Sequence, residues 1–438
     1  MNLGTELELG PDYDPAPYIL PRGGTLYSRD TSQEWARWRR ARDSFVPAPK
    51  LSIAQYVALT PRRRMLYDLH CAATHANLPI LETPMSAQLT QLIETRIKNN
   101  ALTWGPATRD GVMVTGGGFQ GKTETICEIA ATFEDYWWQL TDLLAKPTPG
   151  TRDLMIPVAY VQTPVTAKPK STCEAILDFY GAHIPKYATL PQLLRQVRAC
   201  IKDNRTVVLI LDDITRLRLH RADDQDTFDM IRGLMSMQVT LILVGVDIRE
   251  STLLSRARFD ARADQWIFPE AANISGSDRG LETQHERRFN LLELDRFHYD
   301  TPGINAWVAH LTGIEERLRL LEAPPGMLTA GGMPEYLYQR TNGIVGFLSR
   351  LISSACECVM AGRDKAEPEV LTEALLDTIA IDPYEAPGRD PAAGEIPHVP
   401  ERRPQPSGKS RERAAAKRSS AKRRNGSFDD PGLATPHR

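Results

Sequence analysis

The sequence predicts an α/β fold: a parallel β-sheet covered by helices on both faces, with further helices before and after it. From about residue 110, apolar strand candidates alternate with helical stretches, a pattern typical of a parallel sheet. The strand candidates are VMVT, IPVAYVQ, TVVLILD, VTLILVG and FNLLEL, and the helical stretches between them include PQLLRQVRACIKD and DTFDMIRGLMSM. With 438 residues, 42% of them hydrophobic, the chain is large enough for two or three domains and a sizeable core.

Helical segments precede the predicted sheet. TSQEWARWRRARDSF begins with a capping-box pair, Thr31 with Glu34, and predicts a short basic helix. Trp35 and Trp38 fall on one side of this helix, which favours a docking face over a nucleic-acid platform. LSIAQYVALTPRRRMLYDLHCAAT predicts two helices, the second starting near Pro61, and SAQLTQLIETRIKNNA predicts another.

After the sheet, the chain divides into a helical part and a polar tail. It is helical in pattern from about residue 301, which suggests a lid, and from about Pro383 its Pro, Gly, Ser, Lys and Arg content predicts disorder. Ten Lys/Arg and two Glu between Glu401 and Gly426 give this stretch a charge of +8, against −2 for the whole chain. The predicted domains are an N-terminal extension with helices, an α/β core, a helical lid and a disordered basic tail, at residues 1–100, 101–298, 299–382 and 383–438.

Cysteine usage and the N-terminus bear on the compartment. The six cysteines are scattered, with no CxxC pair and no matching His spacing, which argues against a zinc site and favours reduced thiols. The start, MNLGTELELGPDYDPAP, lacks the basic and apolar regions of a signal peptide, and no apolar run reaches membrane-spanning length. We therefore expect a cytoplasmic protein with no membrane partner.

The stretch GVMVTGGGFQGKTETICEIA carries a phosphate-binding motif. Gly116, Gly121, Lys122 and Thr123 fit G-x-x-x-x-G-K-[ST], between a predicted strand and a predicted helix. Main-chain N–H groups and the helix N-terminus would surround phosphate oxygens, while Lys122 reaches the β- and γ-phosphates and Thr123 binds Mg²⁺. The alternative is a Gly-rich turn without a ligand. The expected cofactors are ATP and Mg²⁺, and the predicted binding residues are Gly116, Gly117, Gly118, Phe119, Gln120, Gly121, Lys122, Thr123 and Glu124.

A pair of acids follows another predicted strand. TVVLILDD ends in Asp212 and Asp213, and an acid just past a buried strand lies at the carboxyl edge of the sheet, where ligands bind. Asp212 would hold Mg²⁺ together with Thr123, and Asp213 would polarise the attacking water as a general base. A solvated acidic turn is the alternative. Lys122 and Asp213 are thus candidate catalytic residues.

The combination of segments resembles the TniB/TnsC-type transposition ATPases, a branch of the AAA+ class. IPVAYVQTP with TCEAILDFYGA is similar to the family's second strand and following helix, and TLILVGVDI with Arg258–Phe259 and Trp266 resembles its sensor-strand region. FNLLELDRF and NGIVGFLSRLISSACECVMAGR resemble its last strand and C-terminal helix. The resemblance covers about residues 50–380 and implies an AAA+ P-loop NTPase core with a C-terminal helical lid.

Some positions depart from the AAA+ pattern. Asp213 stands where these ATPases usually have Glu; it is one methylene shorter, so hydrolysis is expected to be slow or the water placed differently. Val246 occupies the usual polar sensor position, with Asp247 next to it. The usual spacing for a lid arginine falls on Gly346, and Arg350 lies one turn further.

The resemblance implies an ATP-dependent regulator of transposition that binds duplex DNA without sequence specificity. ATP-loaded copies would assemble on target DNA as rings or filaments and recruit or activate a transposase, and hydrolysis would take the assembly apart. An arginine at the end of a helix would stabilise the γ-phosphate of a neighbouring subunit in trans. Arg258 is the first candidate for this catalytic role and Arg256 the second, and a surface arginine is the alternative.

Basic segments offer two candidate DNA contacts. The segment TRLRLHR directly after the acids could line a channel and touch phosphates, or be a solvated charged face. The tail KSRERAAAKRSSAKRRNG could attract DNA in a salt-dependent way, or dock a protein partner. The sequence contains no base-reading motif, so specific recognition is not expected.

Two other functions remain open from the sequence. A nucleotide-switched signalling or defence ATPase would share the P-loop and act on a protein partner without DNA. A replication-initiator or clamp-loader-like ATPase would need a sequence-reading domain after the lid, and the predicted disordered tail leaves no room for one.

Overall fold

The computed structural model describes most of the chain up to residue 381. The described residues are 13–19, 28–106, 108–144, 155–165, 168–216, 224–248, 258–260, 262, 265–268, 287–363 and 367–381. Contacts divide the chain into Met1–Glu395 and Ile396–Arg438, so every described residue belongs to the first unit. The predicted basic tail lies outside the described residues, and the predicted boundaries within residues 1–382 stay a prediction.

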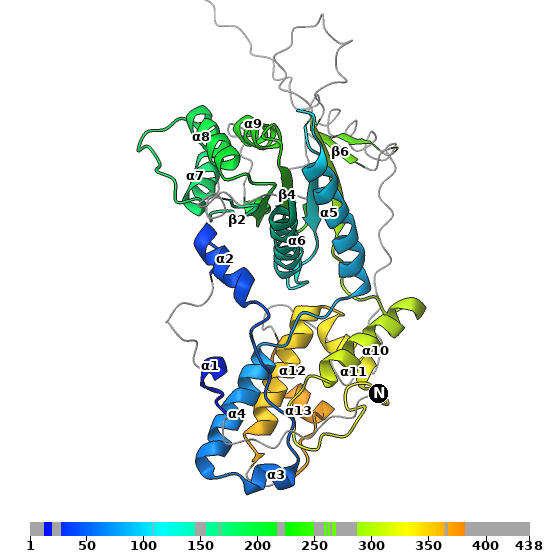
Figure 1. Cartoon of the computed structure of the whole chain (residues 1–438). Coiled ribbons are helices and arrows are strands. Elements are labelled where there is room, and N and C mark those ends of the chain that lie inside the picture. The colour runs from blue at the N-terminus through cyan, green and yellow to red at the C-terminus, as the bar shows by residue number, and fades with distance from the viewer. Residues whose placement is uncertain are drawn as a thin grey trace, which may run out of the picture. The chain divides into compact units, whose positions relative to one another are not determined.

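A seven-stranded sheet forms the α/β core (Figure 1). Five neighbouring strands run parallel, and two antiparallel strands continue the sheet beyond one of its edges. In spatial order the strands are β2 (Val158–Gln162), β3 (Val208–Asp212), β4 (Thr240–Val244), β1 (Gly111–Thr115), β7 (Arg287–Glu293), β6 (Gln265–Phe268) and β5 (Arg258–Asp260). All five strands that the sequence predicts are present and parallel, so the α/β class is confirmed; the β5–β6 pair was not predicted.

Strand β1 lies between β4 and β7 and places the candidate phosphate loop in the middle of the sheet. Val112 is in register with Ile242 on one side and Asn290 on the other. Every residue of β1, β3 and β4 is buried, as expected for aliphatic strands covered on both faces. Because these strands are parallel, their carboxyl ends meet at one edge, where the predicted site residues lie.

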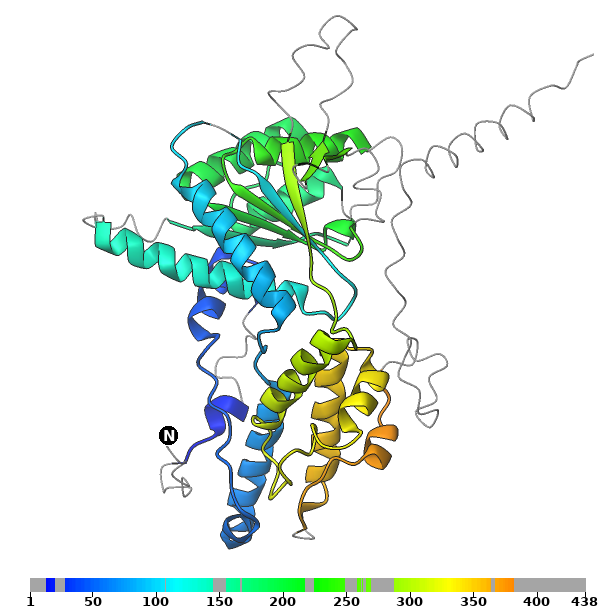
Figure 2. The same cartoon turned by 90° about the vertical axis from the view of Figure 1, so that its right-hand side faces the viewer.

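Two groups of helices cover the sheet. α5 (Pro84–Leu102) packs against α6 (Lys122–Leu144), while α8 (Leu190–Asp203) contacts both α7 (Pro169–Phe179) and α9 (Asp224–Met235). Figure 2 shows the α5–α6 pair and the α7–α8–α9 group on opposite sides of the sheet. The two groups provide the coverage of both faces that the sequence pattern predicts.

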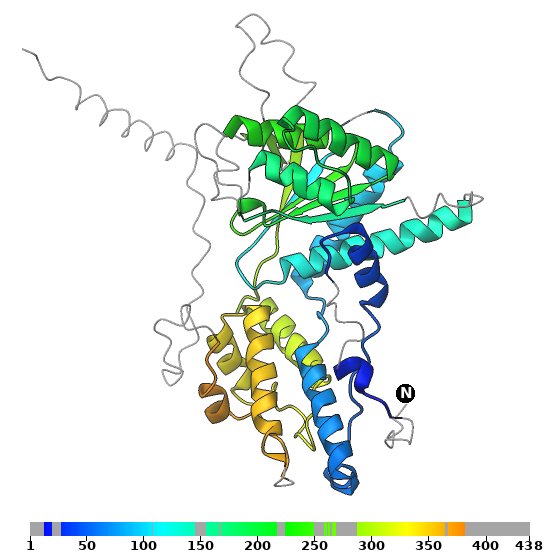
Figure 3. The ribbon, with the colours of Figure 1, turned by 90° about the vertical axis from the view of Figure 1, so that its left-hand side faces the viewer.

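The helices at the two ends of the described chain pack together. α4 (Pro61–Ala76) lies against α12 (Val345–Met360), as Figure 3 shows, and α1 (Ala16–Ile19) contacts α4. Tyr67 and Cys71 of α4 share a buried cluster with Met360 of α12. The remaining elements are α3 (Ile53–Ala58), a 3₁₀ turn η1 (Ile214–Arg216), α10 (Thr301–Glu315), α11 (Met333–Thr341) and α13 (Glu373–Asp377). Helices that precede the sheet in the sequence thus pack with helices that follow it, and together they form one helical cluster.

The predicted basic helix is α2 (Ser32–Ala41), and it docks on the core of its own chain. Thr31 caps it by accepting a hydrogen bond from the Glu34 N–H at 3.3 Å. Trp35 is buried and donates from Nε1 to Glu134 Oε2 of α6 at 2.6 Å. The predicted docking face of α2 is therefore used within the chain.

A helix that crosses a bilayer must be both long and apolar. Of the helices that the structure describes, none is by itself long and apolar enough to cross a bilayer. Helices α11 and α12, which meet at a 115° bend, pass on length and composition only as a pair.

Candidate nucleotide-binding site

The loop from residue 116 to 121 joins the end of β1 to the start of α6. A Cβ added at Gly116 would lie 2.3 Å from the Leu294 carbonyl oxygen and 2.4 Å from Gln120 Oε1, so only glycine fits there. Phe119 at the tip of the loop has a left-handed backbone, with φ of 59°. Helix α6 begins at Lys122, so the free N–H groups of its first turn and its positive dipole end face the loop. Together these features make an anion-binding concavity.

Lys122 is held inside this loop. Its Nζ donates to the carbonyl oxygens of Gly116 at 3.1 Å and Gly117 at 2.6 Å. Burial lowers the pKa of Lys122, and Asp212, Asp247 and Asp213 oppose this shift in that order. The ammonium group therefore lies in the field of three acids at the same sheet edge.

The predicted metal-holding residues are in direct contact. Thr123 Oγ1 donates to Asp212 Oδ2 at 2.7 Å, and Asp212 is buried. The other oxygen of Asp212 accepts the N–H of Asp213 at 2.8 Å. A hydroxyl and a carboxylate are oxygen ligands that suit Mg²⁺. The structure thus brings together Thr123 and Asp212, which lie 89 residues apart in sequence.

Asp213 is close to this pair but points elsewhere. Its backbone is left-handed, with φ of 53°. Its Oδ2 pairs with Arg216 at 2.8 Å and accepts a hydrogen bond from Gln162 Nε2 at 3.2 Å. Arg216 also donates to the Thr163 carbonyl oxygen at 3.1 Å. The predicted general base is therefore held by partners that the sequence reasoning did not assign to it.

The end of β4 is tied to the end of β1. The Gly245 N–H donates to the Val114 carbonyl oxygen at 3.0 Å, and the Ile248 N–H donates to Thr115 Oγ1 at 3.0 Å. Between them, Val246 and Asp247 are exposed, and Asp247 has a left-handed backbone with φ of 46°. Of these two sensor candidates, Asp247 is the one that acts electrostatically on Lys122.

The C-terminal helices touch the tip of the loop through a glycine. The Gly346 N–H donates to the Phe119 carbonyl oxygen at 3.0 Å, and a Cβ at Gly346 would lie 2.6 Å from that oxygen. The Phe119 ring packs on Phe347 at 5.0 Å and under the Arg350 guanidinium at 5.1 Å. Close approach thus explains why glycine occupies the position of the usual lid arginine, and Arg350 packs on an aromatic ring.

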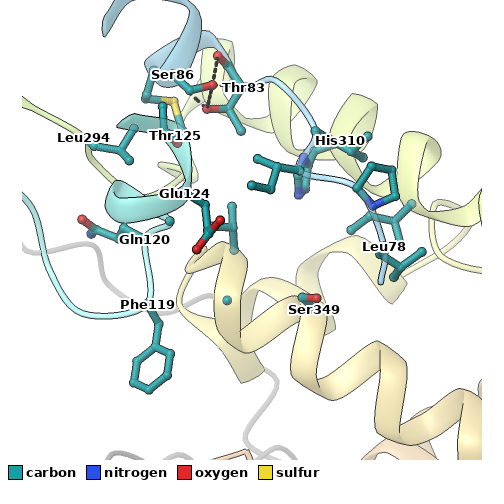
Figure 4. A pocket seen from close by; sticks show the side chains of 18 of the residues that line it. Leu78, Thr83, Ser86, Phe119, Gln120, Glu124, Thr125, Leu294, His310 and Ser349 are labelled. Atoms are coloured by element: carbon teal, nitrogen blue, oxygen red, sulfur yellow. Dashed lines mark hydrogen bonds between the residues drawn. The ribbon is translucent and has the colours of Figure 1, made fainter. Parts of the chain in front are cut away.

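A cavity of about 190 Å³ adjoins the loop (Figure 4). It is lined by residues of the segment before α5, the phosphate loop, and helices α6, α10 and α12. Glu124 and His310 face it from α6 and α10. Burial lowers the pKa of His310 to about 4, so its imidazole is neutral at pH 7. The volume is below the roughly 300–1,000 Å³ of pockets that enclose a drug-sized ligand, so the cavity would enclose only part of such a ligand.

The arginine candidates fall differently from the expectation. Arg258 begins strand β5 and does not end a helix, which corrects the predicted local structure. This strand forms the outer edge of the sheet, beyond β7 and β6 as seen from the phosphate loop. Arg256, Arg218, His220 and Arg221 lie outside the described residues. Two strands, β6 and β7, therefore lie between the backbone of Arg258 and the strand that precedes the phosphate loop of the same chain.

Sequence reasoning missed three contacts of this site: those made by Arg29, Tyr160 and Gln162. Tyr160 donates from its hydroxyl to Asp212 Oδ2 at 2.9 Å, and Arg29 pairs with Glu124. The cavity was missed too, because its lining comes from segments more than 200 residues apart. Tyr160 and Gln162 lie in the segment IPVAYVQTP, which marked a strand and not a contact with the acids, and Arg29 lies in no motif.

The residues present fit a nucleoside triphosphate with magnesium. The loop leaves no room for a Cβ at Gly116, a lysine sits within it, and a hydroxyl meets a buried carboxylate beside it. Bound magnesium would neutralise phosphate charge and so favour attack on the γ-phosphorus. Lys122 and the loop amides would bind phosphate oxygens, and Thr123 and Asp212 would hold the metal.

Comparison with known families agrees with this arrangement. Residues 87–270 match the family model described as "Bacterial TniB protein". The resemblance predicted from the sequence is confirmed over this segment. The match spans the phosphate loop and both acids, and with the loop geometry it supports nucleotide binding. A search of curated proteins finds no significant match.

Some solved structures are similar to this chain at low identity. The Aeropyrum pernix ORC1 protein in complex with DNA is 12% identical, with 70% of this chain and 68% of that chain covered and a TM-score of 0.45. CDC6P from Pyrobaculum aerophilum is 11% identical over 66% of each chain, with a TM-score of 0.41. AMPPCP-bound DnaA from Aquifex aeolicus is 13% identical over 65% of this chain and 66% of that chain, with a TM-score of 0.34.

Proposed function

We propose that this protein is a Mg²⁺-dependent ATPase that oligomerises on duplex DNA and recruits or activates a transposase. ATP would hold the assembly together, and hydrolysis would take it apart. The observation that carries the proposal is the phosphate loop with Thr123 against Asp212, inside a segment that matches the TniB family. The cytoplasmic location expected from the sequence belongs to this proposal.

Each site residue has a role in this proposal. Lys122 and the main-chain N–H groups of the loop bind the β- and γ-phosphates, and Thr123 with Asp212 holds the metal. Asp213 accepts the proton of the attacking water, while Arg216 and Gln162 hold its Oδ2. The pairing with Arg216, which lowers the basicity of the carboxylate, and the side chain one methylene shorter than Glu support slow turnover.

Arg258 is proposed to act on a neighbouring copy. It begins the edge strand β5, with β6 and β7 between it and the strand that precedes the loop. An arginine at the outer edge of a sheet is better placed for the nucleotide of a second subunit than for its own. Replacement by alanine should then abolish turnover while each copy still binds nucleotide.

The deciding experiment is electron microscopy of the protein with duplex DNA and a slowly hydrolysed ATP analogue. We expect rings or filaments that need the analogue and are absent in Lys122→Ala. Assembly on DNA that is equally good without nucleotide would contradict the proposed mechanism. Adding a candidate transposase to these assemblies then tests recruitment, measured by co-sedimentation.

One observation favours a second function, a nucleotide-switched ATPase that acts on a protein partner. Arg216, the first basic residue of the segment expected to touch DNA, is bound to Asp213 and to the Thr163 carbonyl oxygen. The side chain is exposed, but its charge is already paired with a carboxylate, which weakens its attraction for a phosphate backbone. Turnover stimulated by a protein, with no response to duplex DNA, would favour this alternative.

A further inference from the structure

A cluster of aromatic and basic side chains lies beside Thr123 and Asp212, the two residues that would hold magnesium. We call residues 28–42 the strap; this segment contains α2 and lies on α6 and β2. Its Trp35 ring stacks on Tyr160 with centroids 5.9 Å apart, and Trp35 also packs on Trp38 at 4.9 Å. Arg42 of the strap pairs with Asp135 of α6 at 2.8 Å. The strap is therefore anchored on α6, which carries Lys122 and Thr123, and on β2, which carries Tyr160.

Tyr160 links the strap to the metal-holding acid. Its hydroxyl donates to Asp212 Oδ2 at 2.9 Å, the same oxygen that accepts from Thr123 at 2.7 Å. With the Asp213 N–H on the other oxygen, the Asp212 carboxylate is oriented at both ends.

Arg29 of the strap reaches the other side of the site. Its guanidinium makes two hydrogen bonds to the Glu124 carboxylate, at 2.5 and 3.1 Å, and Glu124 directly follows Thr123 in the first turn of α6. The same guanidinium lies over the rings of Trp38 at 4.9 Å and Tyr160 at 5.5 Å. One strap side chain thus contacts both Tyr160 and the neighbour of Thr123.

We propose that Tyr160 and Arg29 are positioning residues for the magnesium-holding pair Thr123 and Asp212, and that the strap is part of the nucleotide site. This inference rests on the proposed function. Tyr160 fixes the carboxylate, and Arg29 fixes the first turn of α6. Because linkage is reciprocal, Mg²⁺–nucleotide that binds better to the fixed pair also stabilises the docked strap.

The test is equilibrium binding of a fluorescent, slowly hydrolysed ATP analogue, with Mg²⁺ and with EDTA. In Tyr160→Phe, loss of a hydrogen bond to a charged group should weaken binding about tenfold with Mg²⁺ and leave binding in EDTA unchanged. The matched control is Tyr180→Phe, which removes another buried phenol hydroxyl, bonded to Thr206 at 2.8 Å and not to the site. It should leave both affinities unchanged.

A second readout follows the strap itself. In the wild-type protein, Mg²⁺–nucleotide should slow proteolytic cleavage within residues 28–42, and Arg29→Ala should abolish this protection while the core stays folded. Two results would overturn this inference without touching the proposed function, provided that the wild-type protein binds Mg²⁺–nucleotide. One is an affinity of Tyr160→Phe equal to that of wild type both with Mg²⁺ and with EDTA. The other is unchanged protection of the strap in Arg29→Ala. Absence of any nucleotide binding by the wild type would instead refute the proposed function.

Discussion

Lys122, which is half-buried, and Arg363, which is buried, are two cations of this chain that are held in opposite ways. Lys122 contacts backbone carbonyl oxygens of the phosphate loop, with several acids at a distance. Arg363, in the helical cluster, bonds through Nε to Glu369 at 2.5 Å and through one terminal nitrogen to Asp68 at 2.6 Å. Its other terminal nitrogen donates to the Arg319 carbonyl oxygen at 2.9 Å.

The difference separates a structural cluster from a ligand site. Every nitrogen of Arg363 that can donate has a protein acceptor, and its side chain is 2% exposed, so the cluster is complete without a ligand. It joins Asp68 of α4 to the C-terminal segment, which lies 295 residues later. The loop around Lys122 instead presents donors toward a shared concavity.

Arg363→Ala should unfold the protein more easily. It leaves the Glu369 carboxylate, whose side chain is 3% exposed, without its cation, and breaking a buried pair in this way costs about 3–5 kcal/mol. Urea unfolding measures the loss, and nucleotide affinity of the folded variant should match wild type. A loss under about 1 kcal/mol would mean that the cluster is not structural.

Lys122→Ala should have the reverse profile. Removing a charge that contacts two phosphates should weaken ATP binding about 1,000-fold, or roughly 4 kcal/mol. The free energy of unfolding should change little, because the Lys122 ammonium bonds to backbone carbonyl oxygens, whereas Arg363 bonds to a buried carboxylate. Isothermal titration and urea unfolding on the same samples check both halves. Unchanged ATP affinity would contradict the assignment of Lys122 to a nucleotide-binding site.

The helical cluster should also be sensitive to acid through His75. Burial, then Arg363 and Arg319, lower its pKa to about 4 from an ordinary value near 6.5. Between these values the unfolded chain binds a proton that the folded chain does not, so stability falls as the pH drops from about 6.5 to about 4.

The variant His75→Gln cannot titrate, and it offers an oxygen to the Arg319 N–H that now donates to His75 Nε2 at 2.9 Å. The loss of unfolding free energy from pH 7 to pH 4 should therefore be smaller in this variant by roughly 2–3 kcal/mol. The exposed His183→Gln is the control, and it should show the wild-type loss. Identical curves for His75→Gln and wild type would contradict the pKa assignment.

Gly346→Ala should give the smallest effect, at the contact between the two regions. The added Cβ meets the Phe119 carbonyl oxygen at 2.6 Å, and overpacking of this kind costs about 1–2 kcal/mol. Gly332→Ala is the control, since nothing lies within 4 Å of its Cβ position. Thermal unfolding compares the two variants; equal melting temperatures would show that α12 does not pack tightly on the loop.

The sequence by itself determined the α/β class and the location of the phosphate loop. The five aliphatic strands, the loop motif and the acids after β3 are local patterns, in which neighbouring residues carry the whole signal. Thr123 and Asp212 were paired in advance because parallel strands bring their carboxyl ends to one edge. The start of α2 was predicted for the same reason, since its cap lies within four residues.

Only the tertiary structure decided which other side chains complete the site. Arg29 reaches Glu124 across 95 residues, and Tyr160 reaches Asp212 across 52. No periodicity or motif records such a contact, because it depends on how the strap lies on the core and not on local conformation. The β5–β6 pair and the packing of α4 on α12 were missed for the same physical reason. A lone tyrosine in a buried strand looks like core until the carboxylate that its hydroxyl contacts is in view.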